Sequence, residues 1–189
     1  MQSRSYGSLS FPMNAFESLG LEVRLVISQE EIREAFRARA AESHPDGGGD
    51  DAEFTTLREA RDILESPAKR LREWLRVKGV EADARGTIAG ELVDFFQKVA
   101  ATGADAEVAI KSSTAAQSAL AKGMAEVRLM GTREKVKNLL SEIEAGIASR
   151  EEQFPAIEKG EADAATALRD LVFLEKWRGA MRSLYGRLI

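Results

Sequence analysis

The sequence predicts an all-α protein in which a short N-terminal helical domain precedes a longer C-terminal helical bundle. Apolar side chains recur three and four residues apart from Asn14 onward, and no segment alternates apolar and polar residues between turn signals as a strand does. The counts of Gly (15) and Pro (4) among 189 residues also disfavour a loop-rich all-β fold.

Four helices are expected in the first part of the chain, over 14–19, 28–43, 51–66 and 67–79. The second begins at Ser28, which has Glu31 three residues later in a capping-box pattern, and it must end before Pro45. The third repeats apolar residues at helical spacing and has a similar length, so the two should fold back on each other as an antiparallel hairpin. Pro67 then starts a new helix, because Pro is tolerated in a first helical turn.

A linker is expected at 80–87 (VEADARGT), which has few large apolar side chains and contains a Gly. Beyond it, helical patterns predict an antiparallel bundle with helices over 88–101, 104–130, 132–149 and 161–188. We therefore expect a helical hairpin domain over 14–79 and a bundle over 88–189, and we interpret residues 1–13 as a flexible tail.

Composition excludes several kinds of function. Lys and Arg total 27 against 31 for Asp and Glu, and the net charge of −4 excludes a generally basic nucleic-acid binder. The absence of Cys removes thiol nucleophiles and Cys-ligated zinc or iron–sulfur sites, and a single His cannot build a His-rich metal site. No apolar run approaches the roughly 18–20 residues that cross a bilayer. We expect a cytoplasmic protein with no metal or cofactor that binds neither nucleic acid nor membranes.

The tripeptide His44-Pro45-Asp46 is the strongest local signal. It lies at the junction of two expected helices and is followed by Gly47-Gly48-Gly49. A catalytic His–Asp dyad is excluded, because the chain offers no Ser-centred elbow, no Cys and no second His to complete it. Over 14–79 the chain resembles the J-domain family, the co-chaperones of DnaK-type heat-shock ATPases. The resemblance implies a four-helix domain with this loop between its second and third helices.

That resemblance also implies that the chain is not itself an enzyme. The loop would bind the ATP state of the chaperone and lower the partner's barrier to hydrolysis, an effect limited by the difference in affinity between the partner's two states. Asp46 would pair with a basic group of the chaperone, Pro45 would stiffen the loop, and His44 would fix it through hydrogen bonding.

Two arginines of the 28–43 helix are expected to extend this site. Arg33, Arg37 and His44 lie within about 40° of one another on a helical surface. The two guanidiniums suit carboxylates of a partner, and the resemblance implies that basic residues here engage the chaperone's ATPase domain. The helix carries four Glu against three Arg, so we expect weak electrostatic steering. A plain solvated face is the alternative interpretation of Arg33 and Arg37.

Among J-proteins the layout resembles HscB, which delivers an iron–sulfur scaffold protein to an HscA-type chaperone. The segments 16–23 (FESLGLEV) and 66–79 (SPAKRLREWLRVKG) are similar to HscB-type sequences, and neither a Gly/Phe-rich segment nor Cys zinc repeats follow the J-like part. The resemblance implies a client site at the start of the second domain, where Leu92, Val93 and Phe96 are the nearest candidates. The other interpretation of these three residues is bundle core.

Two further functions stay open. One is a generic J-protein whose bundle recruits an unrelated client, and the other is a structural interaction protein whose J-like half has lost activity. The chain is expected to be a monomer or a weak dimer associating through its last helix.

Overall fold

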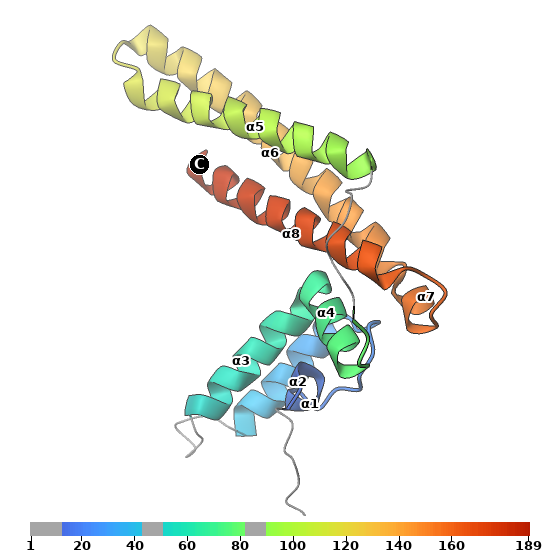
Figure 1. Cartoon of the computed structure of the whole chain (residues 1–189). Helices are drawn as coiled ribbons and strands as arrows, with labels where there is room; N and C mark the ends of the chain where they lie inside the picture. Colours follow the sequence, from blue (N-terminus) through green and yellow to red (C-terminus); the bar gives the residue numbers. More distant parts are fainter. Residues whose placement is uncertain (1–12, 43–50, 82–89) are drawn as a thin grey trace, which may run out of the picture. The chain divides into compact units, whose positions relative to one another are not determined.

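The structure, a computed structural model, describes residues 13–42, 51–81 and 90–189 (Figure 1). Every regular element in these ranges is an α-helix, which confirms the predicted fold class. The internal contacts divide the chain into two compact units, Met1–Glu81 and Ala82–Ile189, and each is considered by itself. The boundary falls within the expected linker 80–87, and most of that linker lies outside the described residues, as does nearly all of the expected tail.

In its described part the N-terminal unit has four helices: α1 (Ala15–Ser18), α2 (Gln29–Glu42), α3 (Asp51–Glu65) and α4 (Pro67–Val77). They follow the expected ranges closely, and three of the four begin after a side chain that caps them. Asn14, Ser28 and Ser66 precede three of these helices, and each accepts a hydrogen bond from the backbone N–H three residues later, at 2.9, 3.1 and 3.2 Å.

The core of this unit draws on all four helices and on the irregular segment between α1 and α2. α3 packs against α1, α2 and α4, and α2 and α3 lie side by side as a hairpin (Figure 1). The following apolar side chains are almost completely buried: Phe16, Leu25, Ile32, Leu57, Leu64 and Leu71. Because α2 has only Ile32 fully buried, most of its surface is available for other contacts.

Two charged residues of α4 connect other parts of the N-terminal unit. Arg70 is buried, and its Nη1 donates hydrogen bonds to the carbonyl oxygens of Ile27 at 3.1 Å and Leu64 at 3.3 Å. It thereby joins the chain just before α2 to the end of α3. Glu73 accepts from the first N–H of α1 at 3.0 Å, and its hydrogen bond with Arg76 lowers the pKa of the Glu73 carboxyl. The sequence pattern indicated neither role.

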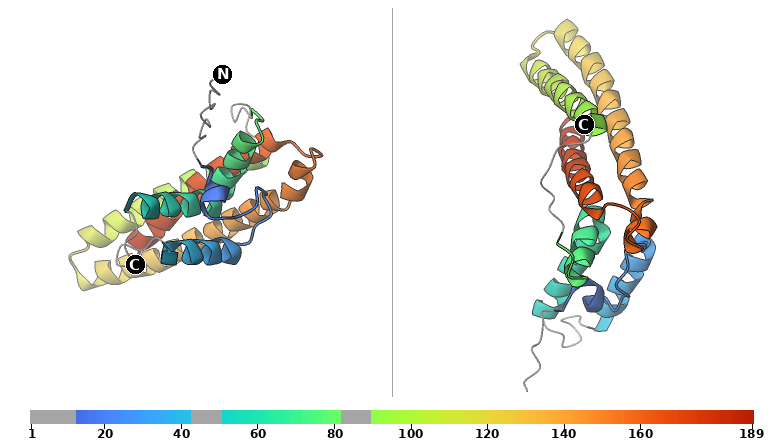
Figure 2. Two further views of the ribbon diagram at one scale, coloured as in Figure 1. Left: turned by 90° about the horizontal axis from the view of Figure 1, so that it is seen from below. Right: turned by 45° about the vertical axis from the view of Figure 1, so that its right-hand side comes forward.

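The C-terminal unit contains α5 (Gly90–Ala115), α6 (Ala119–Glu151), α7 (Phe154–Glu158) and α8 (Ala164–Arg187). The long helices α5 and α6 form an antiparallel hairpin, and α8 packs along α6 and part of α5 (Figure 2). Its core is lined by the apolar stripes that the sequence predicts, with Val136, Ile143, Leu168, Leu171 and Trp177 all buried.

The predicted helix ends near Gly103 and Gly131 are wrong. α5 continues through Gly103 and α6 through Gly131, because a Gly inside a helix costs only about 1 kcal/mol relative to Ala, and burial of nearby residues such as Ala106 and Val136 outweighs that cost. The turn lies instead just before Ser118, whose hydroxyl accepts from the N–H three residues later and caps α6. The short helix α7 was not predicted.

One ion pair is nearly enclosed within this unit. Arg150 of α6 donates from Nη2 to Asp170 of α8 at 3.2 Å, and the side chain of Asp170 is almost fully buried. Because a buried charge is costly without a partner, the pair fixes the register of α8 on α6. In the described ranges, no helix combines the length and the apolar content needed to span a membrane.

Candidate functional site

The exposed face of α2 carries the two arginines that the sequence predicts as a docking surface. Ile32 turns inward to the core, and Arg33 and Arg37 project from the exposed side one turn apart. The structure therefore brings these two guanidiniums together on one face, as helical geometry predicts.

Carboxylates already hold both arginines. Arg37 Nη2 lies 2.8 Å from Glu30 Oε1, and Arg33 lies 3.9 Å from Glu30 and 3.8 Å from Glu65 of α3. All four side chains are partly or largely exposed, so these pairs are weak and a partner's carboxylates can replace them at low cost. The charge on this face is thus nearly balanced, in agreement with the weak steering expected from the composition of the helix.

A pocket of 470 Å³ lies between α2 and α3 on the same face. Its floor is Phe36, and the Arg61 guanidinium carbon lies 4.7 Å from the centre of that ring, within the range of a cation–π contact. Arg33, Arg37 and Glu65 stand around the rim. The site therefore offers an aromatic surface among charges of both signs. Sequence reasoning missed Arg61 and Glu65, because their place beside α2 depends on how α3 is rotated.

The residues with the strongest sequence signal, His44, Pro45 and Asp46, lie outside the described residues. They belong to the segment 43–50 that joins Glu42 at the end of α2 to Asp51 at the start of α3.

The predicted client cluster at the start of α5 is split by the structure. Leu92 is 1% exposed, so its prediction as a client contact is corrected: the side chain belongs to the bundle core. Val93 and Phe96 are 42% and 58% exposed and remain accessible. The Phe96 ring lies 6.5 Å from that of Trp177 on α8, which supports it from one side. Of the three predicted client residues, Val93 and Phe96 can therefore contact another protein directly, and Leu92 cannot.

No group of three or more His, Asp or Glu side chains within the described ranges is arranged to hold a metal ion. The resolved pKa shifts in the bundle have structural causes. Asp163 caps α8, and its hydrogen bond from the Thr166 hydroxyl, followed by those from backbone N–H groups, lowers the pKa of its carboxyl. The Lys135 ammonium lowers the pKa of Asp105 in the same way across α5 and α6.

Comparisons with known proteins find similarity to most of the N-terminal unit. A family model described as "DnaJ domain" matches residues 14–72. Two curated proteins align with 55 residues, 29% of this chain: "DnaJ protein homolog" from Cucumis sativus at 38% identity and "Chaperone protein dnaJ A6" from Oryza sativa subsp. japonica at 40%. Those 55 residues represent 13% of the length of each relative.

A solved structure resembles the chain over a greater length. "Chaperone HscB from Vibrio cholerae" superposes with a TM-score of 0.57 at 19% sequence identity, covering 94% of this chain and 100% of that one. At this identity the likeness shows a shared fold. Residues 14–72 of this chain are therefore similar to the DnaJ-domain family, and the chain shares the all-α fold of HscB.

Proposed function

We propose that this protein is a J-protein co-chaperone that stimulates ATP hydrolysis by a DnaK-type chaperone. The observation that carries the proposal is the DnaJ-domain match over 14–72, which includes His44-Pro45-Asp46 between the two helices of a packed hairpin. Under this proposal the chain has no catalytic residue of its own and acts in the cytoplasm, where it favours one nucleotide state of its partner.

Contacts within the N-terminal unit support a division of roles. Arg70 joins the chain just before α2 to the end of α3 through its hydrogen bonds to the carbonyl oxygens of Ile27 and Leu64, which holds the two helices of the hairpin together. Arg33 and Arg37 would exchange their pairing with Glu30 and Glu65 for carboxylates of the chaperone. Because this exchange leaves the number of ion pairs nearly unchanged, α2 would contribute orientation more than affinity.

The test is the rate at which the chaperone hydrolyses prebound ATP in a single turnover, with and without the full chain. We expect severalfold stimulation by the wild-type protein and none by His44→Gln, because the glutamine removes the imidazole at the proposed contact. Arg72→Ala is the matched control, since Arg72 is exposed on α4 away from α2 and should leave stimulation unchanged. No stimulation by the wild-type protein would favour the structural alternative, and equal stimulation by the wild-type protein and by His44→Gln would contradict the proposed role of His44.

We further propose that the C-terminal unit binds the client, and that the client is an iron–sulfur scaffold protein, as the resemblance to HscB implies. The exposed pair Val93 and Phe96 supports this, because apolar side chains in contact with solvent at the start of the unit are available to a partner. A generic J-protein with another client is the alternative.

Titration calorimetry of a purified scaffold protein with the full chain tests the client assignment. The double variant Val93→Ala/Phe96→Ala should weaken binding about tenfold or more, as truncation of an apolar anchor typically does. Val108→Ala is the matched control, because Val108 is equally exposed on α5 and lies four turns away. Absence of scaffold binding by the wild-type chain would leave the generic J-protein.

A further inference from the structure

The far end of the α5–α6 hairpin presents a surface that the proposed co-chaperone function does not use. The polar contacts of α8 with this hairpin reach Glu107, which pairs with Arg187, and Arg133, which donates to the carbonyl oxygen of Leu188. Residues 108–130 extend beyond these contacts, and the end of α8 stops well short of the hairpin tip (Figure 1). The tip therefore consists of two helices without a third to cover them.

Four large apolar side chains of α6 are exposed in this region, and the fourth is Met130. The first three, Leu120, Met124 and Val127, are 75%, 67% and 72% exposed. Their spacing of four and three residues places them within about 60° of one another around the helix, so they form one stripe, called here the tip stripe. Its exposed area, on the order of 400 Å², is within the range that marks interaction sites on soluble proteins.

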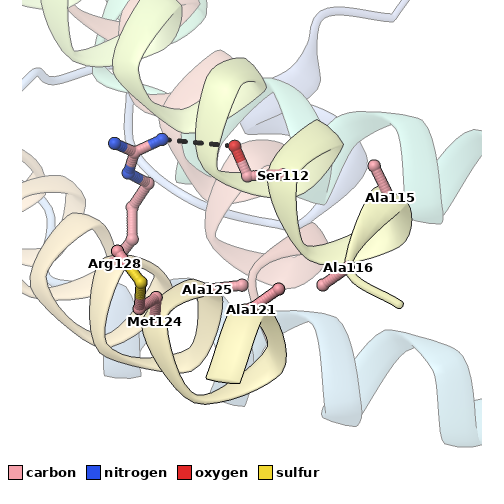
Figure 3. A pocket seen from close by; sticks show the side chains of 7 residues that line it. All are labelled: Ser112, Ala115, Ala116, Ala121, Met124, Ala125 and Arg128. Carbon is pink, nitrogen blue, oxygen red and sulfur yellow. Dashed lines mark hydrogen bonds between the residues drawn. The ribbon is translucent and has the colours of Figure 1, made fainter. Parts of the chain in front are cut away.

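A pocket of 340 Å³ opens between the two helices beside the tip stripe (Figure 3). Its lining includes four alanines, Ala115, Ala116, Ala121 and Ala125, together with Ser112, Met124 and Arg128. The small alanines leave space between the helices, and Met124 belongs to both the pocket and the stripe. The flexible, polarisable Met side chain adapts readily to a partner's apolar group.

A ladder of polar contacts crosses from α5 to α6 and ends at this pocket. Lys98 pairs with Glu142, and seven residues farther along α5 Asp105 pairs with Lys135 at 2.8 Å. Seven residues farther along α5, Arg128 of α6 donates to the Ser112 hydroxyl at 3.2 Å. In the two earlier pairs the cation has a carboxylate as its partner, whereas the partner of Arg128 is a neutral hydroxyl. Within the described part of the chain, no carboxylate lies within ion-pair distance of Arg128. The guanidinium at the pocket's edge thus has capacity for an anionic partner.

The charge around the tip has the opposite sign to that of the whole chain. Residues 108–130 carry Lys111, Lys122 and Arg128 against the single acid Glu126, whereas the protein as a whole has a net charge of −4. A complementary partner must therefore combine an apolar side chain with nearby negative charge.

We propose that the tip stripe and its pocket bind an acidic amphipathic peptide segment of a partner protein. An apolar side chain of the segment enters the pocket beside Met124, and a carboxylate near it pairs with Arg128. The tip stripe provides about half of the roughly 800 Å² per partner that stable protein interfaces bury, so a second copy of this chain docked on it would not form a stable dimer. The concave pocket also suits a protruding side chain better than a flat membrane surface.

Fluorescence anisotropy with the full chain and a labelled synthetic peptide tests the proposal. The probe is an amphipathic helical peptide with leucines along one face and glutamates beside them, and its counterpart has lysines at the glutamate positions. We expect only the acidic peptide to bind. Arg128→Gln should weaken its binding about fivefold or more through loss of the charged pair, and Met124→Asp about tenfold or more through loss of the apolar contact. The control Val108→Ala should bind as the wild type does.

Because Met124 and Arg128 are exposed, these variants should keep the wild-type far-ultraviolet circular dichroism. Unchanged affinity in Arg128→Gln and Met124→Asp, or no binding at millimolar peptide, would overturn the proposal. So would tighter binding to phosphatidylserine-containing vesicles than to the peptide, or a dimer in sedimentation that Met124→Asp dissociates. His44→Gln should still bind the peptide and Met124→Asp should still stimulate the chaperone, so failure of this proposal and failure of the co-chaperone proposal are distinguishable.

Discussion

Replacing Leu92 by Ala should destabilise the C-terminal unit far more than replacing both of its exposed neighbours. Leu92 is almost completely buried near the start of α5. The change removes three carbons from packed surroundings, a loss of about 2.4 kcal/mol at about 0.8 kcal/mol per buried CH₂. The cavity that remains raises the total loss in the free energy of unfolding to about 3 kcal/mol.

The double variant Val93→Ala/Phe96→Ala should lose within about 1 kcal/mol, because roughly half of each side chain already contacts solvent and Ala has the higher helix propensity. Its effect on client binding can then be measured on a folded protein. Leu92→Ala, in contrast, would reduce binding through loss of the fold.

Urea unfolding followed by tryptophan fluorescence provides the assay. The chain has two tryptophans, Trp74 in the N-terminal unit and Trp177 in the bundle. In a Trp74→Phe background Trp177 is the remaining tryptophan, so the fluorescence reports unfolding of the bundle. The Trp177 ring lies 6.5 Å from that of Phe95 on α5, so the signal is sensitive to the packing of α5. Equal destabilisation by Leu92→Ala and by the double variant would refute the orientation of α5, because it would mean that all three side chains are buried alike.

Three further predictions concern Arg70 in the N-terminal unit, the Asp163 cap in the bundle and the Glu30–Arg37 ion pair on α2. Arg70→Met should lower the free energy of unfolding of the N-terminal unit by about 2–4 kcal/mol, measured through Trp74, because two buried carbonyls lose their donor. Asp163→Ala should cost the bundle about 1 kcal/mol at pH 7 through loss of the α8 cap. Since the folded state lowers the pKa of this carboxyl below its unfolded value near 3.9, the difference should be complete above about pH 5 and shrink as the pH falls through the lower folded pKa. Glu30→Gln should free Arg37 and lower the concentration of this protein that half-maximally stimulates the chaperone at low salt, with the gain disappearing at high salt.

The N-terminal unit could be predicted from the sequence nearly helix by helix. Its helices are short, and local signals at Asn14, Ser28 and Ser66 decide where three of the four begin. The two long helices of the bundle could not be predicted in this way. A Gly is a weak helix breaker, and whether Gly103 or Gly131 ends a helix depends on packing partners far away in the sequence.

The candidate site could be predicted only where it depends on one helix. The common face of Arg33 and Arg37 follows from the period of α2 alone. The pairing of Arg33 with Glu65 depends on the rotation of α3, and the burial of Leu92 depends on which side of α5 faces the rest of the bundle. The periodicity of one segment predicts neither the pairing with Glu65 nor the burial of Leu92, because the same spacing is compatible with several rotations of a helix against its neighbour.

The affinity of the full chain for a DnaK-type chaperone in its two nucleotide states tests the central claim most directly. A hydrolysis-deficient chaperone bound to ATP and the same chaperone bound to ADP are titrated in parallel against the wild-type protein and against His44→Gln. The account predicts clearly tighter binding to the ATP state, with the preference lost in His44→Gln. Equal affinity of the wild-type protein for both states, or a preference that persists in His44→Gln, would contradict it.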